Sequence, residues 1–263
     1  MQRSARYLHQ LFGLDSSVAI VIGGTGVLGG ALCDGLAAAG ARVIVAGRSE
    51  ERGAARAGAI GRAGGSARFH PVDVTSRQSL EELRDSALAE EGRAEVLVNC
   101  AGVNSAVPYE QISDEDWQRV LDTNLKATHL ACQIFAPVMA AQPGGGSILN
   151  IGSVTAHLPL SRVFAYSASK AAVNNLTKNV AREYAPKGVR VNSLNPGFFP
   201  AEQNRKILQP ERVQKIMEQT PMGRFGEAHE LVGAALLLVS AQAGAFITGA
   251  EVFVDGGFTA MRF

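Results

Sequence analysis

Short apolar runs alternate with longer stretches of helical periodicity along almost the whole chain. Most of the short runs are uninterrupted rather than alternating with polar residues, which is typical of strands covered by helices on both faces. Seven runs have the length of strands, at residues 18–22, 42–46, 67–71, 96–99, 147–151, 190–194 and 251–254.

The stretches between these runs have helical patterns at residues 27–39, 76–91, 114–140, 164–184 and 227–240. Gly40 suits the C′ position of the first helix, Ser76 is a candidate N-cap of the second, and Pro137 is expected to bend or end the third. Strand–helix alternation of this kind predicts an α/β architecture, a three-layer, doubly wound Rossmann fold with a seven-stranded parallel sheet.

The chain has 263 residues, which is long enough for one large domain and short for two. It contains no repeat and no linker, so residues 1–263 are expected to form a single domain. The first ten residues are interpreted as a short arm before the first strand. Residues 198–226 are the one long irregular segment, and such a segment inside a compact domain predicts a substrate loop or lid.

Composition excludes several classes of partner. Acidic and basic residues nearly balance, at 24 against 25, which argues against nucleic acid and anionic membranes. Cys33, Cys100 and Cys132 lack metal-ligand spacing, so no metal is predicted and free thiols in a reducing cytoplasm are expected. No stretch approaches the roughly 20 apolar residues of a membrane span, and the N-terminus lacks the apolar region of a secretory signal.

The stretch VIGGTGVLGG at residues 21–30 is a candidate phosphate-binding turn. Glycines allow backbone N–H groups to approach a pyrophosphate, whose charge the helix N-terminus favours. The motif alone is a weak signal, and a tight structural corner is the alternative. The strand before it and the helix after it favour the nucleotide site. Its glycines are Gly23, Gly24, Gly26 and Gly29.

The end of the second strand bears on the choice of dinucleotide. A site for NAD usually places a carboxylate there, whereas this chain has Gly47 followed by Arg48. A guanidinium suits a 2′-phosphate, so NADP is favoured and NAD stays possible. The alternative is a solvated loop arginine whose charge Glu50 and Glu51 blunt.

Ser153, Tyr166 and Lys170 form the candidate catalytic set. Tyr166 and Lys170 are four residues apart on a predicted helix and share a face. The pKa of a free tyrosine is about 10, and a nearby ammonium is expected to lower it. Ser153 follows the fifth strand and can hold a substrate oxygen. Together they predict proton exchange with a carbonyl oxygen while a nicotinamide cofactor moves hydride.

With these motifs in order, nearly the whole chain resembles the classical short-chain dehydrogenases/reductases. The supporting segments are VIGGTGVLG, PVDVT, VNCAG, DTNLKAT, RVNSLNPG and VDGGF. The resemblance implies that Asn124 joins Ser153, Tyr166 and Lys170 in proton transfer. It implies cofactor contacts by Gly23, Thr25, Gly26, Leu28, Gly29, Asp73, Val74, Asn99, Ala101, Gly102, Tyr166, Lys170, Pro196 and Gly197.

Three positions depart from the family's motifs. Ile22 replaces the usual threonine, Val27 the middle glycine, and Cys100 the second asparagine. Val27 matters most, because a β-branched residue requires ordinary helical backbone angles there. Gly26 is expected to supply the flexibility one residue earlier, so that the site survives.

Three further segments are similar to a bacterial subgroup of D-mannonate oxidoreductases or fructuronate reductases, with gluconate 5-dehydrogenases close by. They are NPGFFPAEQNRKIL, TPMGRFGE and HLPLSRVFAYSASKAAV. A sugar acid needs a cation for its carboxylate, best met by an arginine fork. Arg162 or Arg205 is the candidate, although either is equally well explained as a solvated arginine. Asn104 and Ser153 are expected to meet the substrate's oxygens.

Two alternatives stay open. A 3-oxoacyl-thioester reductase would use a basic patch for an acidic carrier protein, and Arg205, Lys206, Arg212 and Lys215 form such a cluster. A dinucleotide sensor would bind NADP without turnover, but such proteins tend to lose the tyrosine or the lysine. The family resemblance also implies a homotetramer or homodimer.

Overall fold

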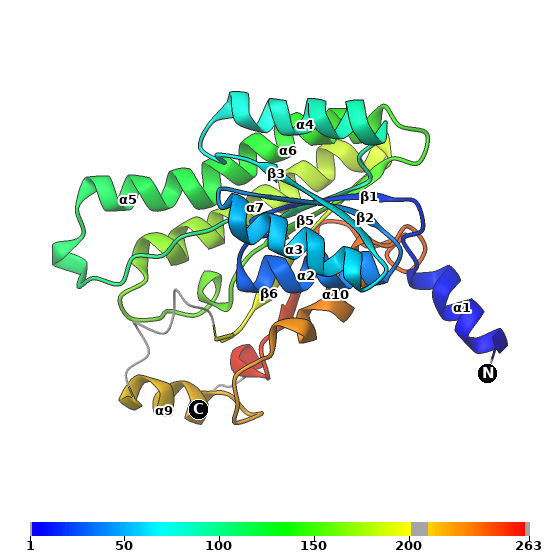
Figure 1. Ribbon diagram of the computed structural model, residues 1–263. Coiled ribbons are helices and arrows are strands. Elements are labelled where there is room, and N and C mark those ends of the chain that lie inside the picture. The colour runs from blue at the N-terminus through cyan, green and yellow to red at the C-terminus, as the bar shows by residue number, and fades with distance from the viewer. Residues whose placement is uncertain (1, 201–209, 261–263) are drawn as a thin grey trace.

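A seven-stranded parallel sheet forms the middle layer of the protein (Figure 1). The structure is a computed structural model that describes residues 2–200 and 210–260. The strands lie in the order β3-β2-β1-β4-β5-β6-β7, and every pair is parallel. Their bounds are β1 (Val18–Ile22), β2 (Arg42–Gly47), β3 (Ser66–Pro71), β4 (Val96–Asn99), β5 (Gly146–Ile151), β6 (Val189–Pro196) and β7 (Glu251–Val254).

The order of strands reverses beside β1, which pairs with β2 on one side and with β4 on the other. In this register Ile22 lies opposite both Ala46 and Asn99, so the three strands end at the same level. A crevice outside the carboxyl ends of the strands is expected at such a reversal, and it is the usual ligand site of this architecture. The predicted fold class is confirmed.

Helices cover both faces of the sheet (Figure 1). In one layer the helices pack on β1, β2 and β3 and, at the other end, on β5 and β6, whereas in the other layer they pack on β4, β5 and β6. The first layer contains α2 (Val27–Ala38), α3 (Glu50–Arg62) and α10 (Val232–Val239). The second contains α4 (Arg77–Glu91), α5 (Asp114–Leu121), α6 (Ala127–Ala140) and α7 (Phe164–Tyr184).

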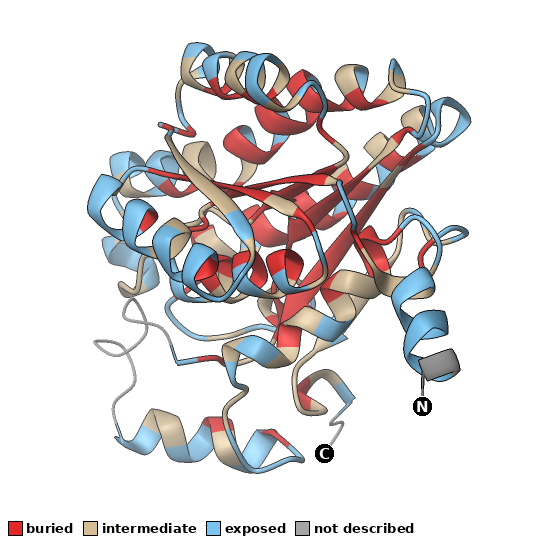
Figure 2. Ribbon diagram, turned by 45° about the vertical axis from the view of Figure 1, so that its right-hand side comes forward, coloured by how far each residue is buried: buried red, intermediate tan, exposed pale blue. Residues whose placement is uncertain are grey.

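The core consists of two apolar clusters, one on each face of the sheet. Within β1, Val18, Ile20 and Ile22 belong to one cluster, whereas Ala19 and Val21 belong to the other. Alternate side chains of a strand point to opposite faces. Both faces are therefore buried, which explains the uninterrupted apolar runs. Figure 2 shows the buried residues concentrated along the strands.

Two predicted helix ends have the expected chemistry. Gly40 follows α2 with a φ of +100°, which a residue with a Cβ rarely adopts. The hydroxyl of Ser76 accepts a hydrogen bond from the Ser79 amide at the start of α4. The last predicted helix is a 3₁₀ turn, η5 (Ala228–Leu231), followed by α10.

The long helix predicted at 114–140 is interrupted. A π-helical turn, η2 (Asp122–Lys126), separates α5 from α6. Pro137 lies inside α6, which ends three residues later at Ala140. The interruption places Asn124 in the π turn, a feature that is frequent at functional sites.

Three helices were not predicted. Residues taken as an N-terminal arm form α1 (Gln2–Phe12), whose Leu11 carbonyl accepts a hydrogen bond from the Ser240 hydroxyl. Helix α3 follows β2, and α9 (Pro210–Gln219) lies within the segment expected to be irregular. Few side chains of α3 and α9 are buried, Gly53 and Ile60 in the first and Ile216 in the second, and polar residues separate their few large apolar ones.

Short 3₁₀ turns complete the chain: η1 (Tyr109–Gln111), η3 (Val154–Ala156), η4 (Ala185–Lys187) and η6 (Phe258–Ala260). Among the described helices, none is both long enough and apolar enough to span a bilayer.

Candidate active site

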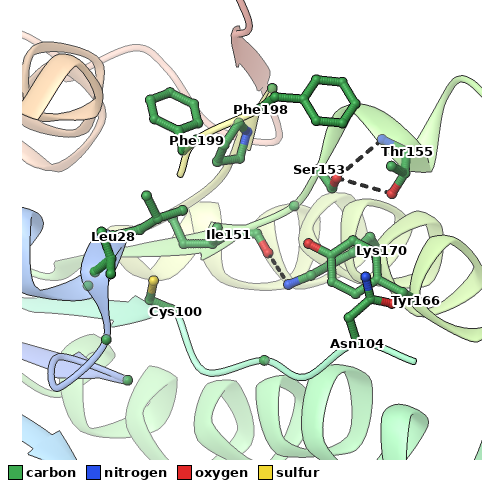
Figure 3. Close-up of a pocket in the computed structure, with 18 of the residues that line it drawn as sticks. Leu28, Cys100, Asn104, Ile151, Ser153, Thr155, Tyr166, Lys170, Phe198 and Phe199 are labelled. Atoms are coloured by element: carbon green, nitrogen blue, oxygen red, sulfur yellow. Dashed lines mark hydrogen bonds between the residues drawn. The ribbon is translucent and has the colours of Figure 1, made fainter. Parts of the chain in front are cut away.

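A cavity of about 430 Å³ opens at the carboxyl ends of the strands (Figure 3). The turn after β1, the segments after β4, β5 and β6, and helix α7 all contribute to its wall. Most predicted site residues meet there. They are Gly23, Thr25, Gly26, Leu28, Gly29, Gly102, Asn104, Ser153, Tyr166, Lys170, Pro196 and Gly197.

The turn between β1 and α2 is a cradle that side chains would fill. Gly23 has a φ of +88°, and a Cβ there would lie 2.6 Å from the Ala101 nitrogen. A Cβ on Gly29 would lie 2.3 Å from the Gly23 oxygen. Helix α2 begins after Gly26, which offers no capping side chain, so its first N–H groups are available to an anion at the cavity. These residues fit the pyrophosphate of a dinucleotide.

Val27 does not distort this turn. It is the first residue of α2, so its backbone is helical as expected, and its side chain is 41% exposed beside the cavity. The adjacent departure, Ile22, packs in the core at 3% exposure. Neither substitution closes the cradle.

Lys170 is buried beneath the cavity and anchored to the sheet. Its Nζ donates a hydrogen bond of 2.7 Å to the Ile151 carbonyl at the end of β5 (Figure 3). Burial lowers the pKa of the ammonium from 10.5 to about 8. The same Nζ lies 5.6 Å from the centre of the Tyr166 ring, so the two side chains share a helix face as predicted.

The expected acidification of Tyr166 is wrong in direction. The pKa of its phenol is raised, because burial outweighs the opposing hydrogen bond with Ser153. The Lys170 ammonium donates to the Ile151 carbonyl rather than to the phenol oxygen, which explains why it does not set the pKa of Tyr166. In this state Tyr166 holds its proton at neutral pH.

Ser153 is held by two sets of hydrogen bonds. Its backbone N–H donates to the Asn195 side chain at 3.0 Å. Its hydroxyl accepts from the amide and the hydroxyl of Thr155, at 3.2 and 3.1 Å (Figure 3). A hydroxyl accepts two hydrogen bonds and donates one, so the Ser153 proton is left to donate toward the phenol or a substrate oxygen.

A buried polar network, which the sequence did not reveal, holds the Asn195 side chain that accepts from the Ser153 amide. Asn174 on α7 donates to the Asn195 oxygen at 2.9 Å and to the Glu251 carboxylate at 2.9 Å. The Ser193 hydroxyl donates to Asn174 at 2.6 Å. Because these partners come from β6, β7 and α7, the network fixes the end of β5 relative to the catalytic helix.

Asn124 is fully buried behind the cavity. Its side chain bridges the Val103 backbone, accepting from the nitrogen at 2.8 Å and donating to the oxygen at 3.0 Å, and donates to the Ser169 hydroxyl. A Cβ on Gly102 would lie 3.3 Å from the Asn124 oxygen and 3.7 Å from the Lys170 nitrogen. The structure therefore brings Asn124 close to Lys170, behind the lining.

The residues at the end of β4 and after it differ in whether they reach the cavity. The buried Asn99 amide donates to Asn150 at 2.8 Å, and its oxygen has no partner among the described residues. Cys100 lines the cavity, and burial raises the pKa of its thiol to about 11. Asn99 and Ala101 do not line the cavity. Cys100 is thus a neutral thiol where the family carries an amide.

The side predicted for the adenosine is more open. Arg48 and Asp73 are exposed and outside the lining, and Val74 packs in the core. Hydrogen bonds from Thr75 lower the pKa of Asp73, and the charge of Arg48 adds to this effect. The charge of Arg48 thus acts on the carboxylate of Asp73.

Sequence reasoning missed two other arginines on this side. Arg52 and Arg56 line the cavity from α3, and Arg56 forms an ion pair of 2.5 Å with Asp34. Their position on the first turns of a helix directly after β2 is the feature that could have identified them, but that helix was not predicted.

On the substrate side, the predictions are met in part. Asn104 lines the cavity, with its oxygen accepting from the Ser105 amide at 2.7 Å. Arg162 is exposed, has a φ of +64°, and does not line the cavity. Arg205 lies outside the described residues. Arg212 on α9, named in the sequence only as part of a basic cluster, lines the cavity instead.

Apolar side chains close the same side. Those that sequence reasoning did not assign are Leu160, Val163, Phe198, Phe199 and Phe225. Outside the lining, the rings of Tyr109 and Phe164 pack with centroids 4.8 Å apart. The described residues contain no group of His, Cys, Asp or Glu side chains that could hold a metal ion.

A dinucleotide cradle beside a Ser–Tyr–Lys set, at the reversal point of a parallel sheet, defines a nicotinamide-dependent oxidoreductase. Comparison with known proteins agrees. Residues 26–259 match the family model described as enoyl-(acyl carrier protein) reductase. The chain belongs to the classical short-chain dehydrogenase/reductase family, whose members are NAD(P)-dependent enzymes acting on alcohol and carbonyl groups.

Relatives of known name match over nearly their full length. The chain is 36% identical to D-threitol dehydrogenase of Mycolicibacterium smegmatis, covering 94% of this chain and 95% of the relative. It is 34% identical to gluconate 5-dehydrogenase of Gluconobacter oxydans, covering 95% and 97%. The crystal structure of a gluconate 5-dehydrogenase from Burkholderia cenocepacia, in complex with NADP and tartrate, superimposes with a TM-score of 0.92 at 34% identity, covering 97% and 100%.

Proposed function

We propose that this enzyme interconverts a ketone and a secondary alcohol on a sugar acid, of the fructuronate/mannonate or ketogluconate type, with NADP as the preferred cofactor. The observation that carries the proposal is the convergence of Ser153, Tyr166 and Lys170 on one cavity with the glycine turn. A nicotinamide dinucleotide supplies or accepts the hydride when bound.

Tyr166 is the proposed general acid for ketone reduction. Its raised pKa keeps the phenol protonated at neutral pH, as a proton donor requires. The Ser153 hydroxyl, whose acceptor sites Thr155 occupies, donates to the substrate oxygen. The Lys170 ammonium lies beside the Tyr166 ring, and Asn124 holds the backbone of Val103 in the segment after β4. The alcohol-oxidising direction uses the same groups in reverse.

The proposed cofactor contacts follow the cradle and the wall of the cavity. Gly23, Thr25, Gly26, Leu28 and Gly29 would hold the pyrophosphate side. Arg48 is the proposed ligand of a 2′-phosphate, and Asp73 and Val74 the proposed contacts of the adenine. Asn99, Ala101 and Gly102 are the proposed contacts after β4. Pro196 and Gly197, with Tyr166 and Lys170, would border the nicotinamide. NADP bound in the Burkholderia cenocepacia relative supports the preference, and NAD stays possible.

The sugar-acid assignment rests on the polar groups of the substrate side and on the relatives. Asn104 and Ser153 both line the cavity, as hydroxyl and carbonyl recognition requires. The relatives include D-threitol dehydrogenase and gluconate 5-dehydrogenase, which supports a polyhydroxylated substrate. The position of Arg162 outside the lining does not support its proposed contact with the carboxylate.

A 3-oxoacyl-thioester reductase is the second candidate. The apolar wall of the cavity, formed by Leu160, Val163, Phe198 and Phe225, favours it. Of the basic cluster suggested for a carrier protein, the two described members differ, since Arg212 lines the cavity whereas Lys215 is exposed on α9. Arg205 and Lys206 lie outside the described residues.

Substrate turnover tests these assignments. NADPH and NADH oxidation is followed at the nicotinamide absorbance band with fructuronate, tagaturonate, 5-ketogluconate and acetoacetyl-CoA. We expect a sugar acid with NADPH to give the highest kcat/KM. Preference for the thioester would select the second candidate, and NADPH binding without turnover of any carbonyl would select the sensor.

Tyr166→Phe tests the proton donor. The variant keeps the ring and its packing but lacks the hydroxyl, so turnover is expected to fall at least about 100-fold. NADPH affinity, measured by fluorescence titration, is expected to stay within about twofold. Substantial activity in this variant would refute the assigned role.

We also propose assembly as a homotetramer or homodimer. Strand β7 is an edge of the sheet, and Phe253 on it is 37% exposed, which leaves apolar surface for a second copy. The cytoplasm is the proposed location, supported by three free cysteines.

A further inference from the structure

Helix α9 brings a guanidinium to the substrate side of the cavity. Arg212 is half-buried and lines the same cavity as Ser153 and Tyr166. Its Nη2 donates a hydrogen bond of 2.9 Å to the Ser161 carbonyl, in the turn before α7. The helix itself is fixed to the protein by Ile216, which is 3% exposed. Arg212 is therefore held at the cavity by contacts at both ends.

This guanidinium has no counter-ion among the residues that the structure describes. Among the described residues, no carboxylate forms an ion pair with Arg212, and the charge that acts on it is that of Arg162, which has the same sign. Burial, and then Arg162, lower the pKa of Arg212. Arg56, which also lines the cavity, is by contrast paired with Asp34. Among the described residues, the substrate side thus presents a positive charge without a paired carboxylate.

We propose that Arg212 binds the carboxylate of an acidic substrate, in the role that the sequence offered to Arg162 or Arg205. The proposal rests on the proposed function, since it adds a charged contact to the same site. A guanidinium carries five N–H donors in a planar fork, and the bond to Ser161 uses one. The remaining donors match the two oxygens of a carboxylate.

The position of Arg212 separates this role from binding the cofactor's phosphates. Arg52 and Arg56 approach the cavity from α3, and Arg56 packs over Gly30 of α2. Arg212 instead approaches from α9 and contacts the turn before the catalytic helix. The cavity therefore has cations beside the glycine turn and another beside the substrate side.

The test compares an acid with a neutral ketone of the same length. The kcat/KM for 5-keto-D-gluconate and for 5-keto-D-fructose is measured with NADPH in the wild type, Arg212→Gln and Arg212→Lys. Lys215→Gln is the matched control, because it removes one positive charge from the exposed face of the same helix. The dissociation constant of NADPH is measured for each variant by fluorescence.

We expect Arg212→Gln to lower kcat/KM for the acid about 10- to 100-fold, as for loss of a charge-assisted pair. The neutral ketone and the NADPH dissociation constant are expected to change by no more than about twofold. Arg212→Lys keeps the charge but loses the fork, and a smaller loss is expected. Calorimetric binding of D-gluconate to the NADPH complex is expected to weaken in parallel, and Lys215→Gln to leave all values unchanged.

Equal losses on both ketones, or a weaker NADPH complex in Arg212→Gln, would overturn the inference and assign Arg212 to the cofactor or to the fold. A wild type that reduces only the neutral ketone and binds no gluconate would overturn it while leaving a polyol or ketose enzyme in place. A wild type inactive on both, but active on acetoacetyl-CoA, would overturn the proposed function as well. If Arg212→Gln does not fold, the ratio of the two substrates in Arg212→Lys decides.

Discussion

Lys170 shows how a single residue can favour function at the expense of stability. In the folded chain its pKa is lowered from 10.5 to about 8, so the folded state disfavours the ammonium by roughly 3 kcal/mol. This penalty is fully present below pH 8. It disappears as the pH rises from about 8 to 10.5, because the folded chain loses this proton near pH 8 and the unfolded chain only near pH 10.5.

Lys170→Met is therefore expected to raise stability at pH 7 while abolishing turnover. Loss of the hydrogen bond to the Ile151 carbonyl cancels about 1 kcal/mol of this gain. The free energy of unfolding is therefore expected to rise by about 1–2 kcal/mol. The melting temperature, followed by circular dichroism, should rise by a few degrees at pH 7, and the difference should shrink at pH 10. A lower melting temperature at pH 7 would contradict the buried-ammonium account.

At the same scale, the sequence predicted that Ser153, Tyr166 and Lys170 would meet but not their ionisation. The spacing of Tyr166 and Lys170, and the position of Ser153 after a strand, follow from local periodicity alone. The raised pKa of Tyr166 depends on burial beneath several elements, which no local pattern encodes. Arg212 was missed as a ligand for the same reason, since its contact with Ser161 joins residues 51 apart.

At the scale of elements, the glycine after β5 is a point where packing and catalysis coincide. A Cβ on Gly152 would lie 2.1 Å from the Asn195 oxygen and 2.6 Å from the Asn174 oxygen. These are the groups that position the Ser153 amide. The residue must therefore lack a side chain if β5, β6 and α7 are to share one network.

Gly152→Ala is expected to cost about 1–3 kcal/mol of stability and to reduce kcat more than it raises KM. Displacement of Asn195 would move the Ser153 backbone away from its productive position. Gly233→Ala in α10 is the control, because nothing lies within 4 Å of its added Cβ. Chemical denaturation and steady-state kinetics measure both effects. An unchanged kcat in a folded Gly152→Ala protein would show that the network does not position Ser153.

The elements also differ in how far the sequence determines them. Every strand was predicted to within two residues, because burial on both faces requires an apolar run. Helix α3 was missed, since its Gly-, Ala- and Arg-rich sequence buries only Gly53 and Ile60. Helix α9 was missed because it has only ten residues, buries only Ile216 and lies within a segment interpreted as irregular. A short helix with one buried side chain is hard to separate from a loop by its apolar residues alone.

At the scale of the whole molecule, the cavity joins the two halves of the sheet, since its wall includes segments after β1 and after β4, β5 and β6. A ligand that binds the folded state alone stabilises the entire domain by mass action. At a concentration 100 times its dissociation constant, NADPH is expected to add about 2.7 kcal/mol. For a domain of this size that corresponds to roughly 5–10 °C in melting temperature.

The difference between the shifts with NADPH and NADH isolates the 2′-phosphate. Arg48 is exposed, so Arg48→Gln is expected to leave the fold intact and to weaken NADPH binding about 10- to 100-fold. The rise in melting temperature with NADPH should then fall toward the rise with NADH, which should itself not change. Arg52→Gln is the matched comparison, because Arg52 lines the cavity from the next helix. If Arg52→Gln alone removes the difference, the phosphate ligand lies on α3 rather than at the end of β2. If neither variant does, the preference for NADP has another origin.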